Sequence, residues 1–168
     1  MQDHLYVKAK FYVSKNKPTK MKKVQLLFFA IICIVSLQKV NGQEYSNALG
    51  IRLSTAQATI NQSVSYRRYL NENTAIEGLL SFDPIAVGAL YEKIYPLGAP
   101  GLQWFFGGGA YVAFKGDNVI GAMGIVGLDY TFQSIPINLS LDWKPELNII
   151  NNVNFQASAV ALSVRFVF

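Results

Sequence analysis

The sequence has little cysteine and histidine: one of each among 168 residues, Cys33 and His4, both before residue 43. Cys33 lies inside an apolar run and follows a large residue, Ile32, so a lipoprotein signal is not expected. Beyond Gly42 there is no thiol for a disulfide and no His or Cys to bind a transition metal. We therefore expect no disulfide, no metal site, no cofactor and no enzyme activity.

The sequence also lacks an apolar run of the ~20 residues that a membrane-spanning helix needs. Its longest run, over residues 24–37, follows a basic start at Met21 and is followed by Val40 and Gly42. A basic start, a short apolar stretch and small or aliphatic residues at the −3 and −1 positions are typical of a secretory signal peptide. We expect cleavage before Gln43.

Three segments follow from this pattern. We expect residues 1–20 to be an upstream extension or a misassigned gene start, residues 21–42 to be the signal peptide, and residues 43–168 to be the mature domain. Eight of the 15 basic residues and one of the 10 acidic residues precede the mature domain, which leaves it with 7 basic and 9 acidic residues. Its net charge of −2 argues against a nucleic-acid partner.

The mature domain shows no helical period and repeats short alternating segments between turn residues. In residues 135–144, for example, every second residue is apolar, and the residues between them are polar or proline. Turn chemistry such as Asp83-Pro84 separates the segments. We predict eight strands, over residues 47–54, 63–70, 74–82, 85–95, 102–114, 119–132, 135–144 and 156–168.

Aromatic placement separates two architectures that share this alternation, a soluble sandwich and a membrane barrel. On the apolar face of the strands, aromatic residues gather near strand ends: Phe82, Tyr91, Tyr95, Trp104, Phe114, Tyr130, Phe132, Trp143, Phe166 and Phe168. Transmembrane barrels carry such aromatic girdles at both water interfaces. The predicted fold is therefore all-β, a closed antiparallel up-and-down transmembrane β-barrel of eight strands, preceded by a signal peptide.

Signal, alternating strands, girdles and a terminal aromatic together make residues 43–168 resemble small bacterial outer-membrane barrels of the OmpA/OmpX/OmpW type. The resemblance implies location in the outer membrane, contact with its lipids, and a monomeric state. It also implies periplasmic chaperones and the barrel-assembly machinery as partners during biogenesis, with Phe166 and Phe168 as the assembly signal. Both ends of the mature chain are then periplasmic.

The strand parity predicts which charges face the interior of the barrel. Eight do: Arg52, Arg67, Glu77, Glu92, Asp129, Asp142, Lys144 and Arg165. Arg68 and Lys93 face outward near the periplasmic strand ends. Because strands 1 and 8 are neighbours, we expect Arg52 and Arg165 to share acidic partners. Glu77 and Glu92 could form a catalytic carboxylate pair, but salt bridges are favoured.

These interior charges admit two interpretations. In the favoured one, ion pairs and bulky residues fill a lumen too narrow for a pore, and the protein has a structural or interaction role. The bulky set is Leu79, Leu90, Phe105, Tyr111, Met123 and Ile125. The alternative is a narrow channel, or a lateral route for small solutes, hydrophobic ones included. A surface adhesin is disfavoured because the outer connections, 55–62, 83–84, 115–118 and 145–155, are short.

Overall fold

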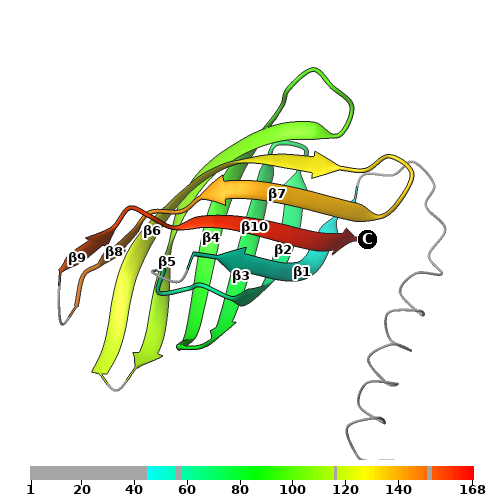
Figure 1. Ribbon diagram of the computed structural model, residues 1–168. Helices are drawn as coiled ribbons and strands as arrows, with labels where there is room; N and C mark the ends of the chain where they lie inside the picture. The colour runs from blue at the N-terminus through cyan, green and yellow to red at the C-terminus, as the bar shows by residue number, and fades with distance from the viewer. Residues whose placement is uncertain (1–44, 56–57, 116, 151–152) are drawn as a thin grey trace, which may run out of the picture. The chain divides into compact units, whose positions relative to one another are not determined.

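A computed structural model describes residues 45–55, 58–115, 117–150 and 153–168 (Figure 1). The expected upstream extension and signal peptide, residues 1–42, lie outside the described residues. The secondary structure of the described part consists of strands and turns, without helix. No helix long and apolar enough to cross a membrane occurs among these residues.

Within the described residues, ten strands form one antiparallel sheet. They are β1 (Asn47–Ser54), β2 (Ser63–Asn71), β3 (Thr74–Phe82), β4 (Ile85–Pro96), β5 (Leu102–Lys115), β6 (Asp117–Thr131), β7 (Ile137–Trp143), β8 (Glu146–Asn148), β9 (Asn154–Gln156) and β10 (Val160–Val167). The first six agree with the predicted strands to within two residues at either end. The seventh and eighth predicted strands contain β7 and β10, whereas β8 and nearly all of β9 lie in the predicted connection over 145–155.

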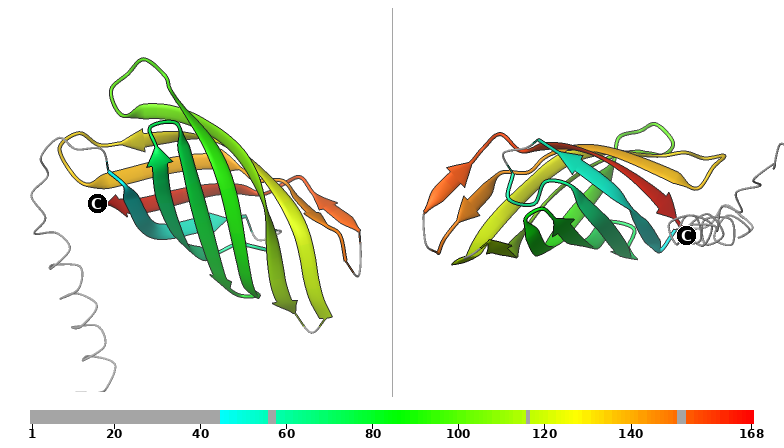
Figure 2. Two further views of the ribbon diagram at one scale, coloured as in Figure 1. Left: turned by 180° about the vertical axis from the view of Figure 1, so that it is seen from behind. Right: turned by 60° about the horizontal axis from the view of Figure 1, so that its bottom comes forward.

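The sheet closes into a barrel because the two ends of the strand series pair with each other. Neighbours follow the order β5-β4-β3-β2-β1-β10-β7-β6, and β6 also pairs with β5. Views from opposite directions show β1, β7 and β10 on one side of the barrel and β2 to β5 on the other (Figure 2). At the seam, Asn47 and Phe168 exchange two backbone hydrogen bonds of 3.0 and 2.9 Å. The predicted closed eight-stranded barrel is thus confirmed.

Pro145 interrupts the strand that follows β6 around the barrel and divides it into β7 and β8. Proline has no N–H to donate to the strand ladder, yet Trp143 before it and Glu146 after it keep the same register with β6. β8 then pairs with β9, and the two project beyond the ring as a hairpin (Figure 1). The predicted outer connection over 145–155 was too long, because only residues 149–153 separate the two strands.

One row of outward side chains runs around the whole barrel through the strand pairing. It leaves β6 at Tyr130, crosses every other wall in turn, and returns to β6 at Ile120. Between these two residues the row contains Leu139, Val164, Ile51, Val64, Leu80, Val87 and Val112. The row returns to β6 ten residues from where it started, and this offset is the shear number of the barrel. Eight strands enclose a space just wide enough for side chains.

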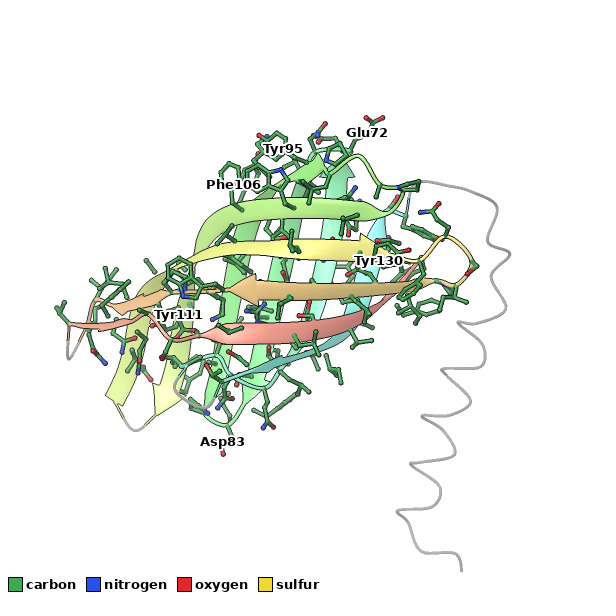
Figure 3. The ribbon with its side chains drawn as sticks, turned by 45° about the horizontal axis from the view of Figure 1, so that its top comes forward. Glu72, Asp83, Tyr95, Phe106, Tyr111 and Tyr130 are labelled. Carbon is green, nitrogen blue, oxygen red and sulfur yellow. The ribbon has the colours of Figure 1, made fainter. Side chains whose placement is uncertain are left out.

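The barrel has two rims, which we name by the chain segments at each. The terminal rim carries Asn47, Phe168 and the turns 72–73, 97–101 and 132–136. The far rim carries the connections β1–β2, β3–β4, β5–β6 and β8–β9. Figure 3 shows Glu72 and Tyr95 at the terminal rim and Asp83 at the far rim.

Candidate functional site: the ion-paired interior

The interior of the barrel holds charged side chains that the outward face largely excludes. Successive residues of a strand face opposite sides, so the parity that turns leucine and valine outward turns these charges inward. All eight charged residues predicted to face the interior are buried there, none more than 3% exposed: Arg52, Arg67, Glu77, Glu92, Asp129, Asp142, Lys144 and Arg165. A charge buried in this way needs an opposite charge and hydrogen bonds to offset lost hydration.

Arg67 on β2 contacts carboxylates from three other strands. Its guanidinium lies 3.2 Å from Glu77 on β3 and 2.9 Å from Glu92 on β4. Its Nη1 lies 3.1 Å from Asp129 on β6, across the lumen. The ring of Phe105 on β5 faces the same guanidinium, with its centroid 4.7 Å away, a cation–π contact. One arginine thus links five walls of the barrel.

Arg165 on β10 joins the same cluster through Glu77. Its Nη2 donates to Glu77 Oε1 at 2.6 Å, so that this carboxylate accepts hydrogen bonds from both Arg67 and Arg165. The other nitrogens of Arg165 donate to hydroxyls: Nε to Ser65 and Nη1 to Ser140, each at 2.7 Å. The last strand is therefore tied to β2, β3 and β7 inside the barrel as well as by its backbone.

Arg52 on β1 pairs with Asp142 on β7 in a two-pronged arrangement. Its Nη1 and Nη2 lie 2.6 and 2.5 Å from the two carboxylate oxygens. The prediction that Arg52 and Arg165 share an acid is wrong, because Arg165 pairs with Glu77 instead. Arg165 lies opposite Gly50, two residues along β1 from Arg52. The two arginines are thus at different heights in the lumen and reach different acids.

Glu146 is a further buried charge that the sequence-based assignment missed, because it placed the residue in an outer connection. The structure places it on β8, buried and paired with the ammonium group of Lys144. Asp142, Lys144 and Glu146 are two residues apart and share one face of the wall. Continuing that series past Pro145 would have found Glu146, but a proline indicates a strand end.

Residues 58–60, which we call the plug segment, lie in the β1–β2 connection at the far rim, and Ile60 packs into the interior. Ile60 is fully buried, and a Cβ added at Gly88 would lie only 2.7 Å from its Cδ1, so this glycine makes room for it. The carboxylate of Glu146 accepts hydrogen bonds from the backbone N–H groups of Thr59, at 2.7 Å, and Ile60, at 3.3 Å. Glu146 thus pairs with Lys144 and also holds the plug segment in place.

An apolar cluster fills the space beside the ion pairs. The bulky residues predicted to face inward are all buried: Leu79, Leu90, Phe105, Tyr111, Met123 and Ile125. They come from β3 to β6, and Ile60 of the plug segment packs in the same cluster. The pairs Arg52–Asp142 and Lys144–Glu146 come from β1 and from the wall of β7 and β8. The lumen is therefore filled by side chains from both sides.

The charged side chains of this interior form ion pairs with one another. Among the described residues there is no group of three or more His, Cys, Asp or Glu that could hold a metal ion. Glu77 and Glu92, the carboxylates that could form an acid–base pair, both contact Arg67. These ion pairs and the plug segment occupy the lumen. The arrangement is suited to holding strands together.

The outer surface carries aromatic side chains at the terminal rim. The rings of Tyr95, Trp104 and Phe106 stack on one another, with neighbouring centroids 5.2 and 5.5 Å apart (Figure 3). The two residues proposed as an assembly signal lie there too, with centroids 6.2 Å apart: Phe166 and Phe168. Trp143 is the last residue of β7, and pairing with β6 resumes beyond it in β8.

Comparison with known proteins adds nothing to this geometry. No family model, curated protein or solved structure matches this chain. The eight-stranded barrel and its ion-paired lumen are features of this chain's own structure. The resemblance to bacterial outer-membrane barrels remains one of architecture.

Proposed function

We propose that this chain is an integral outer-membrane β-barrel protein of a double-membraned bacterium, with a structural or interaction role and no catalysis. The observation that carries the proposal is the reversed distribution of side chains. An unbroken row of apolar and aromatic residues encircles the outside, while arginines and carboxylates pair inside. A water-soluble barrel would have the opposite arrangement, whereas a barrel in lipid needs this one.

The interior favours a closed lumen over a conducting one. Four cationic side chains are each bound to carboxylates within the lumen, and the plug segment packs against the apolar cluster and Glu146. The partners proposed with this role are outer-membrane lipids and, during biogenesis, periplasmic chaperones and the assembly machinery. The chain ends then face the periplasm, and the barrel works as a monomer without nucleic acid.

Fractionation and conductance together test the proposal. We expect the expressed protein in the outer-membrane fraction, with N-terminal sequencing showing Gln43 as its first residue. Purified barrel reconstituted into planar bilayers should show no steady ion conductance. Recovery in a soluble fraction would contradict the membrane location. Steady conductance by the wild-type protein would replace the closed-lumen role with that of a narrow channel.

A further inference from the structure

Two cations on the outward face stand apart from the paired charges inside. Among the described strand residues, Arg68 on β2 and Lys93 on β4 are the charged side chains on the outward parity. Each lies three residues from the end of its strand at the terminal rim. They flank the same strand, since Arg68 pairs with Ile76 of β3 and Lys93 with Thr74. Two strand spacings, about 10 Å, separate β2 from β4.

These two cations have no acidic partner among the described residues. The Nζ atom of Lys93 donates to the hydroxyl of Thr74 at 3.0 Å and lies 5.6 Å from the ring centroid of Tyr91. Arg68 is exposed, and Glu72 in the adjoining turn forms an ion pair with neither cation. Every cation resolved in the lumen, by contrast, contacts a carboxylate. The outward pair therefore offers two positive charges to a partner outside the chain.

The surroundings of the two cations indicate their depth in a membrane. Lys93 lies between Tyr91 and Tyr95 along β4, and its partner on β5 is Phe106 of the aromatic stack (Figure 3). Aromatic rings of membrane proteins favour the level of the lipid headgroups. Long cationic side chains just below that level extend toward phosphate. In the proposed membrane location, Lys93 would thus lie at the height of the lipid phosphates, and Arg68 lies equally far from its own strand end.

We propose that Arg68 and Lys93 form a binding site for one anionic phospholipid, with its phosphate held over β3 between the two cations. The inference rests on the proposed membrane location, which places the terminal rim in the inner leaflet of the outer membrane. Two cations complement a headgroup whose one charge is the phosphate. A zwitterionic headgroup brings its own ammonium group, which the two cations repel, so the site selects phosphatidylglycerol over phosphatidylcholine.

Native mass spectrometry of the folded barrel tests the site, with phosphatidylglycerol and phosphatidylcholine as probes at equal concentration. The wild-type barrel should retain one phosphatidylglycerol with a preference of about tenfold or more over phosphatidylcholine. The double variant Arg68→Gln/Lys93→Gln should lose that preference, and Arg68→Lys/Lys93→Arg should keep it. Glu72→Gln changes charge at the same rim outside the site and serves as the matched control, with the preference unchanged.

Insertion into vesicles of either lipid, followed by heat-modifiable gel mobility, separates this inference from the proposed function. Equal retention of the two lipids by an inserted wild-type barrel would overturn the lipid site and leave the membrane role intact. An undiminished preference in the double glutamine variant would also overturn it. Failure of the wild-type barrel to insert into any vesicle would contradict the membrane role itself. Should the glutamine variant not fold, the wild-type comparison still decides.

Discussion

At the scale of single residues, Glu77 is where the interior charges converge. Its carboxylate contacts Arg67 and Arg165 and accepts a hydrogen bond from Ser65. Removing one partner of a buried ion pair leaves the other charged and without water, and typically costs about 3–5 kcal/mol. Glu77 serves two such partners, so it is the most informative interior position to change.

Replacing Glu77 with alanine should lower the free energy of unfolding by about 3–5 kcal/mol. Urea unfolding of the barrel in lipid vesicles, followed by tryptophan fluorescence, measures this. Glu72→Ala removes an exposed acid from a turn and should change stability by less than about 0.5 kcal/mol. Equal midpoints for the two variants would contradict the ion-paired core. Unchanged stability together with altered ion selectivity would indicate a working channel.

At the scale of elements, the plug segment depends on a neighbouring wall. Its backbone N–H groups are held by Glu146, from a strand more than eighty residues further along the chain. Hydrogen bonds to a charged group contribute about 1.5–3 kcal/mol each. The position of the plug segment in the lumen therefore depends on contacts that a single substitution can remove.

Glu146→Ala should release the plug segment. In an Ile60→Cys background, a thiol reagent should label residue 60 about tenfold faster or more when Glu146 is alanine, as the loss of such hydrogen bonds implies. The reagent can label only the introduced thiol, because the sequence beyond Gly42 has no cysteine. Gln62→Cys, at an exposed position, should react rapidly in both backgrounds. Identical labelling rates at residue 60 would show that Glu146 does not hold the segment.

The terminal strand is expected to matter more for assembly into the membrane than for the stability of the folded barrel. Deleting Phe168 removes two backbone hydrogen bonds with Asn47 and one ring at the rim. The folded barrel should lose only about 1–3 kcal/mol, whereas its amount in the outer membrane should fall strongly if the assembly machinery reads this residue. Quantitative blotting of membrane fractions and unfolding of refolded protein measure the two effects. Normal membrane levels would argue against a recognition role.

At the scale of the whole molecule, the outer surface is apolar, as the proposed membrane location requires. One cross-strand row places leucines on four neighbouring walls, each between 50% and 54% exposed: Leu53, Leu162, Leu141 and Leu128. A row of half-exposed leucines would be unfavourable in water, since apolar surface is stabilised only when removed from it. In a membrane, the same row lies against acyl chains.

Leu141→Arg places a charge in that row and should reduce insertion into vesicles, at a cost of about 2–4 kcal/mol for a cation at mid-membrane depth. The folded fraction, read from heat-modifiable gel mobility, measures the effect. Leu97→Arg introduces the same side chain in an exposed turn of the terminal rim and should insert normally. Equal insertion of the two variants would favour a protein that folds in water.

Much of the architecture followed from the alternating pattern because strand periodicity is local. A side chain's face depends only on its position along the strand, so the strands from 47 to 131 and the inward charges could be read directly. The alternating pattern failed to predict the structure at one place, where a proline indicated the end of a strand. Pro145 indicates a strand end, yet the wall resumes after it, and Glu146 and the β8–β9 hairpin were missed for that reason.

The sequence by itself determined that this chain forms an all-β barrel and, apart from Glu146 and the plug segment, which residues face inward and which face outward. Tertiary structure alone decided which charges meet: Arg52 with Asp142, Arg165 with Glu77, Lys144 with Glu146. It also decided that residues 58–60, a surface connection by sequence, fill the lumen. The reason is that pairing across a barrel depends on shear, which sets the relative height of distant strands. No local pattern carries that offset.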